Sequence, residues 1–136
     1  MIVPVTGLYA GLLALLLIAL GARVSLQRSK LNVGMGHGND PKLARDIRVH
    51  ANGVEWILPM LILLLIAELD GASKTFLHIC GATFVAARVA HAAGLSRTSK
   101  SSSLRFWGMA GTYLVIAVLA VWDIIAFLRI AGRFWR

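Results

Sequence analysis

The sequence predicts an all-α integral membrane protein, a four-helix bundle with up-down topology, from two observations. Of its 136 residues, 58% are hydrophobic and only 15% are charged, whereas soluble domains typically carry about 25% charged residues. The apolar residues also gather into four blocks separated by polar segments. At about 20 residues per spanning helix, four spans fill the chain. A membrane β-barrel would instead show alternating polarity.

The first two blocks predict spans at residues 3–26 and 45–69. No charged residue occurs from Met1 to Ala22, and the basic start and shorter apolar core of a cleavable signal peptide are absent. The second block has only 12 uncharged positions, from Trp56 to Ala67, which is too short to cross a bilayer. This helix must therefore include the polar residues that precede it.

The last two blocks predict spans at residues 75–95 and 106–128, so that residues 1–136 form a single membrane domain. The segment NVGMGHGNDP between the first two spans is rich in glycine and predicts an irregular loop. It lacks the preceding strand and the Gly-Lys-Ser/Thr ending that identify a phosphate-binding loop.

The basic residues predict how the bundle is oriented. Nine Lys or Arg residues fall in or beside the first and third loops, against four on the face that carries both termini. By the positive-inside rule, these two loops are cytoplasmic, and the expected location is a bacterial inner membrane. The nine are Arg23, Arg28, Lys30, Lys42, Arg45, Arg48, Arg97, Lys100 and Arg105, and the four are Lys74, Arg129, Arg133 and Arg136.

Two functional classes are excluded by composition. The formal net charge of +8 does not indicate nucleic-acid binding, because the basic groups sit between apolar blocks rather than along one folded face. One cysteine, Cys80, and four scattered histidines do not have the spacing of metal ligands. We therefore expect neither a nucleic-acid partner nor a metal.

A polar stripe marks the start of the second span. Arg45, Arg48, Asn52, Glu55 and Pro59 fall at offsets of 0, 3, 7, 10 and 14, which at about 100° per residue places them on one helix face. A charged side chain within the bilayer costs roughly 2.5 to 3.5 kcal/mol or more. Such a stripe must face protein or water.

The third span carries Arg88 at about the same depth as Glu55, so an ion pair between them is expected, within one chain or between subunits. That pair has two interpretations. It either fixes helix register, or it belongs to a ligand site with His91 and Arg105 near the same level. Arginine matches carboxylate geometry, so the second interpretation favours a small anion with more than one carboxylate.

The segment RVHANGVEWILP, from Arg48 to Pro59, resembles the signature of the MAPEG superfamily, the membrane-associated proteins in eicosanoid and glutathione metabolism. Its pattern Arg-x-His-x-Asn-x-x-Glu-x-x-x-Pro is that of microsomal glutathione transferases. The segment ARVAHAAG, from Ala87 to Gly94, is similar to small bacterial members of the family.

The resemblance implies a homotrimer that binds glutathione as co-substrate at its subunit interfaces and takes a lipophilic second substrate from the bilayer. Arg105 is the candidate for stabilising the thiolate, with Arg28 as a second. The third-span tyrosines of eukaryotic members match His91 and Leu95. The candidate glutathione-binding residues are Arg45, Arg48, His50, Asn52, Glu55, Trp56, Arg88 and His91.

The leading hypothesis is a membrane-bound glutathione transferase or glutathione-dependent peroxidase acting on lipophilic electrophiles through an arginine-stabilised thiolate. The alternative is a non-catalytic lipid-binding or scaffold protein of the same superfamily. A plain structural membrane protein is a third possibility, since Gly7 and Gly11 have the spacing that lets spanning helices approach closely.

Overall fold

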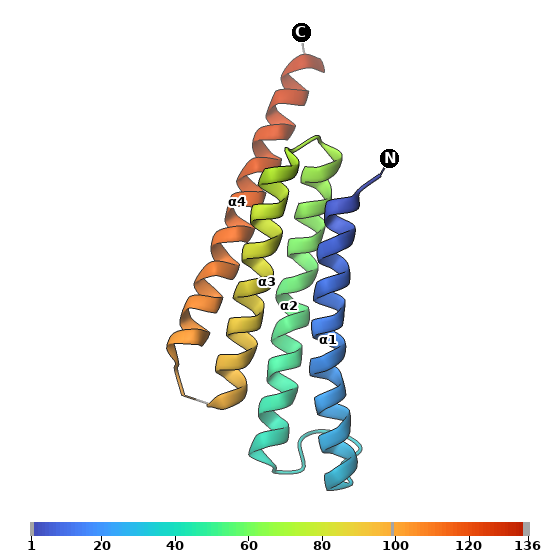
Figure 1. The fold of residues 1–136 in the computed structure, drawn as a ribbon, viewed down its shortest axis with the longest axis vertical. Coiled ribbons are helices and arrows are strands. Elements are labelled where there is room, and N and C mark those ends of the chain that lie inside the picture. The colour runs from blue at the N-terminus through green and yellow to red at the C-terminus, as the bar shows by residue number, and fades with distance from the viewer. Residues whose placement is uncertain (1, 99, 135–136) are drawn as a thin grey trace.

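A computed structural model of the chain contains four α-helices that run alternately up and down (Figure 1). The helices are α1 (Pro4–Leu31), α2 (Pro41–Leu69), α3 (Lys74–Arg97) and α4 (Ser103–Phe134). All four are long and apolar enough to cross a membrane, which confirms the predicted all-α bundle with four spans. The structure describes residues 2–98 and 100–134, so Arg136 of the charge count lies outside the described residues.

The helices extend past the predicted spans at the loop end, because local capping rather than apolarity ends them. At the end of α1, Asn32 adopts the left-handed conformation, and backbone N–H groups bond to the carbonyls of Arg28 and Ser29. The side chain of Asp40 accepts a hydrogen bond from the backbone of Leu43, and Pro41 occupies the first turn of α2. These caps carry basic residues of α1 and α2 beyond the apolar blocks.

Helices α2 and α3 form the centre of the bundle. Each of the outer helices, α1 and α4, packs against both of them, whereas α1 and α4 do not contact each other within the described residues. The outer faces of α1 and α4 therefore carry exposed apolar side chains such as Ile18 and Leu114. In a membrane protein such faces lie against lipid or against another subunit.

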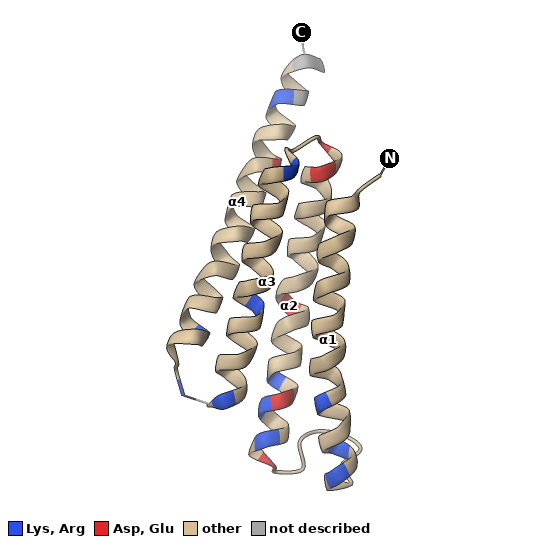
Figure 2. Ribbon diagram, viewed as in Figure 1, with Lys and Arg blue, Asp and Glu red and all other residues tan. Residues whose placement is uncertain are grey.

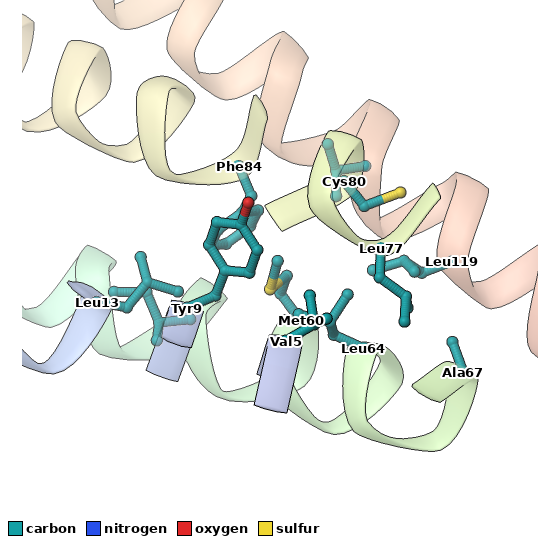
Figure 3. Packing of buried hydrophobic residues seen from close by; sticks show 12 residues of the cluster. Val5, Tyr9, Leu13, Met60, Leu64, Ala67, Leu77, Cys80, Phe84 and Leu119 are labelled. Atoms are coloured by element: carbon teal, nitrogen blue, oxygen red, sulfur yellow. The ribbon is translucent and has the colours of Figure 1, made fainter. Parts of the chain in front are cut away.

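The larger of two apolar clusters lies in the half of the bundle nearer the two termini, and Figure 3 shows its packing. Side chains from all four helices meet there, including Leu13, Met60, Phe84 and Leu119, which are fully buried. Gly81 of α3 is needed in this core, because a Cβ atom at that position would overlap the ring of Tyr9.

At the same end, α1 is tied to α2 and α3 by polar contacts. The carboxylate of Glu68 accepts hydrogen bonds from the backbone N–H groups of Val5 over 3.0 Å and Thr6 over 2.7 Å. The hydroxyl of Tyr9 donates to the carbonyl oxygen of His78 over 3.0 Å and lies 3.1 Å from its Nδ1. We call Glu68, Tyr9 and His78, with the backbone groups they bind, the terminal latch.

Candidate ligand-binding groove

A groove of about 520 Å³ opens between α2, α3 and α4, in the half of the bundle nearer the first and third loops. Its volume lies in the range of small-molecule sites. Figure 2 shows Lys and Arg concentrated at this end of the bundle. The residues that line the groove are Arg48, Asn52, His91, Leu95, Ser101, Arg105, Phe106, Met109, Ala110 and Tyr113.

The α2 side of the groove carries two residues of the predicted polar stripe, Arg48 and Asn52, and both bind Glu55. Arg48 Nη1 lies 2.9 Å from Glu55 Oε1, and Asn52 Nδ2 donates to Glu55 Oε2 over 3.4 Å. The side chains of Arg48 and Glu55 are 60% and 47% exposed, whereas Asn52 is buried. The ion pair therefore lies on the outside of the chain, and Asn52 forms the inner edge of the groove.

Arg88 lies beneath the groove and does not pair with Glu55 within the chain, so the prediction of that pair in one subunit is wrong. Arg88 Nη2 donates to Asn52 Oδ1 over 2.7 Å and to its backbone oxygen over 3.4 Å, and Nη1 donates to Thr112 Oγ1 over 3.3 Å. Two contacts explain the difference. Asn52 lies nearly one helical turn before Glu55, and Glu55 has a nearer cation in Arg48 on its own helix.

Helix α4 supplies the opposite wall with Arg105 and its neighbours. His91 Nδ1 lies 3.1 Å from the backbone oxygen of Arg105, which only accepts hydrogen bonds, so Nδ1 carries the proton. The guanidinium of Arg105 forms no hydrogen bond or ion pair with any described residue. Gly108 allows this close packing, because a Cβ atom there would lie 2.6 Å from the backbone nitrogen of His91.

The structure places the other predicted site residues outside the groove. His50 faces α1, where a Cβ atom on Gly21 would lie 3.3 Å from its Nε2. Arg28 donates to the backbone oxygen of Gly34 over 3.3 Å in a separate hollow beside the first loop. Neither Arg45 nor Trp56 lines the groove. The ring of Trp56 packs edge-to-face against the ring of Tyr113, which does line it, with 5.0 Å between the ring centroids.

Sequence reasoning missed the α4 residues Phe106, Met109 and Tyr113. Their spacing places them on one helix face, yet the fourth span is so uniformly apolar that no face stands out. The available signal was Tyr113, which with Tyr9 makes up all the tyrosine in the chain. Thr112 was also missed, although it is fully buried and meets Arg88.

Together, the bundle and the groove define a multi-pass α-helical membrane protein with a cation-lined groove between its helices. The chain belongs to the MAPEG family, whose model matches residues 6–125. It is 35% identical over 132 residues to the inner membrane protein YecN of Escherichia coli K12, covering 92% of this chain and 99% of that protein. The YecN protein of Escherichia coli O6:H1 matches to the same extent.

Proposed function

We propose that this protein binds glutathione in the groove and uses its thiolate as a transferase or peroxidase acting on lipophilic compounds. One observation carries the proposal: the guanidinium of Arg105, which pairs with no described residue, faces a groove that also contains Arg48 and Asn52. Two arginines and an amide offer the donors that a ligand with two carboxylates and two amide groups requires.

The proposed chemistry depends on the positive charge of Arg105 beside the sulfur of bound glutathione. A thiolate is the reactive form, and a nearby cation lowers the pKa of a free thiol from about 8.5. The thiol proton leaves to water, and the sulfur then forms a bond to an electrophilic carbon as the leaving group departs. With a hydroperoxide, the sulfur takes the terminal oxygen as the O–O bond breaks, and the remaining alkoxide takes a proton and leaves as the alcohol. A second thiol then converts the sulfenic acid to a disulfide and water.

The second substrate would reach the sulfur from the bilayer. The α4 wall of the groove is apolar, with Phe106, Met109 and Ala110 beside Arg105. Phe106 is exposed on this wall. A lipophilic electrophile would therefore approach along α4, while the cationic side of the groove holds the polar tripeptide.

We also propose that the protein is a homotrimer in a bacterial inner membrane, with the first and third loops in the cytoplasm. The exposed Arg48–Glu55 ion pair supports an assembly, because charged groups at this depth must be covered by protein or reached by water. Native mass spectrometry in detergent tests the trimer. Labelling of single cysteines placed in loop one or three from either side of the membrane tests the orientation.

The test of glutathione binding is calorimetry on the detergent-purified protein, with Arg48→Ala and a matched control. We expect saturable binding that Arg48→Ala abolishes and that Arg97→Ala preserves, since Arg97 is exposed at the same end but does not line the groove. Thiolate absorbance followed against pH in the same samples reports the lowered thiol pKa. Absence of binding at millimolar glutathione would exclude the proposal.

A non-catalytic lipid-binding or scaffold role is the second candidate, and Leu95 favours it. This apolar side chain lines the groove at a position where the eukaryotic relatives of the resemblance carry a tyrosine. The scaffold role requires lipid binding without thiolate formation. The same calorimetric samples distinguish the two roles, because only the enzyme shows thiolate absorbance.

A further inference from the structure

We propose that Arg88 is a positioning residue that fixes the orientation of the Asn52 amide, so that Asn52 presents an N–H group to a carboxylate of the ligand. The inference rests on the proposed function and deepens it, since it assigns the recognised group and the residue that prepares its site. Arg88 itself is only 1% exposed and does not line the groove. It acts through Asn52, which does.

The orientation of the amide follows from the chemistry of its partner. A guanidinium has only donors, so the Asn52 atom that lies 2.7 Å from Arg88 Nη2 must be the oxygen. The NH₂ group then points the opposite way, toward Glu55 Oε2 at 3.4 Å. One N–H is used in that long contact, and the other has no partner among the described residues.

Two further hydrogen bonds hold the guanidinium in this position. Arg88 Nη2 also donates to the Asn52 backbone oxygen, and Nη1 donates to Thr112 Oγ1. Thr112 in turn donates to the backbone oxygen of Gly108 over 2.8 Å. The planar guanidinium therefore joins α2, α3 and α4, and the single ammonium of a lysine lacks the fork geometry to do the same.

The charge of Arg88 points to an anion above it. No carboxylate of the described residues lies within ion-pairing distance of Arg88, so its positive charge is balanced only by neutral oxygens. Asn52 separates this charge from the groove, and Arg105 adds a second positive charge across it. A ligand carboxylate over Asn52 would meet an N–H donor and a favourable potential from both arginines.

The first test is Asn52→Asp, which keeps the side-chain shape, removes both N–H donors and gives Arg88 a carboxylate. We expect the affinity for glutathione to fall at least tenfold. In a Glu55→Gln background, which avoids two facing carboxylates at positions 52 and 55, Asn52→Asp should hold or raise the unfolding temperature in detergent. Retained affinity would overturn the proposal, because it would mean that Asn52 offers the ligand its oxygen. A lower unfolding temperature in the Glu55→Gln background would equally overturn it, because a carboxylate in contact with Arg88 would stabilise the fold.

The second test asks whether Arg88 acts through Asn52. In an Arg88→Gln background, Asn52→Asp should no longer raise the unfolding temperature, and the two changes together should weaken glutathione binding less than the product of their single effects. Arg88→Met, which also lacks the charge, replaces Arg88→Gln if the latter does not fold. Independent effects of the two substitutions would show that Arg88 is merely structural.

The unaltered protein separates the two proposals. If it does not bind glutathione, the proposed function fails and the ligand assignment to Asn52 fails with it. The unfolding temperatures of the Asn52 and Arg88 variants still report the Arg88–Asn52 contact, because that measurement needs no ligand. If the unaltered protein binds glutathione and Asn52→Asp binds it equally well, only the positioning role fails.

Discussion

The terminal latch and the groove use similar polar groups in opposite ways. In the latch, both carboxylate oxygens of Glu68 accept backbone N–H groups of α1, and the Tyr9 hydroxyl meets His78. In the groove, the guanidinium of Arg105 and the hydroxyl of Tyr113 form no hydrogen bond with any described residue. The latch is complete within one chain, whereas the groove keeps donors available.

The difference separates stability from function. Polar groups in a span are costly unless they find partners, and the latch provides them by capping the start of α1, where helix N–H groups lack intrahelical acceptors. In the groove, polar groups of α4 stay without partners among the described residues, so their free-energy cost is not offset within the chain. We therefore expect substitutions in the latch to change stability and substitutions in the groove to change ligand chemistry.

The largest expected effect is that of Arg105→Ala. Loss of one charged donor that stabilises a developing anion typically lowers turnover by about 100- to 1,000-fold, and we expect a loss of this size in glutathione conjugation. The unfolding temperature should change little, because the Arg105 guanidinium forms no hydrogen bond or ion pair with the described residues. Thiolate absorbance should require a higher pH. Equal turnover in Arg105→Ala and in the control Arg97→Ala would remove Arg105 from the mechanism.

Glu68→Ala is expected to act on stability instead. It removes the acceptor of two N–H groups at the start of α1, and loss of a helix cap costs about 0.5–2 kcal/mol. Thermal unfolding in detergent measures the change, and Glu68→Gln, which keeps one acceptor oxygen, should recover part of it. Glutathione affinity should not change. A change in affinity at constant stability would contradict the separation of the two regions.

The fold was predictable because apolar length decides it. Four blocks with polar separators fix four spans and an alternating order. The exact helix ends were not predictable from apolarity, since they depend on single caps such as Asp40 and Asn32. In both cases one side chain or one backbone conformation outweighs the average composition of the segment.

The site was predictable only on α2 and in part on α3 and α4. The periodic polar residues of α2 brought Arg48 and Asn52 to the groove, and depth placed His91 and Arg105 correctly beside them. Depth alone could not choose the partner of Arg88, because two oxygens one turn apart compete for it and helix rotation decides. His50 and Arg28 were placed by the family resemblance, and a resemblance in sequence does not say which helix face points inward.

The smallest expected effects come from the two tyrosines, which form a matched pair across the comparison. Tyr9→Phe removes a hydroxyl that bonds to His78 across two helices, and interhelical hydrogen bonds in membrane proteins are worth about 0.6 kcal/mol on average. Tyr113→Phe removes a hydroxyl with no partner in the described chain and keeps the ring contact with Trp56. Thermal unfolding should therefore separate the variants by about 0.6 kcal/mol, with Tyr9→Phe the less stable. Equal stabilities would mean that the latch hydroxyl contributes nothing to the free energy of unfolding.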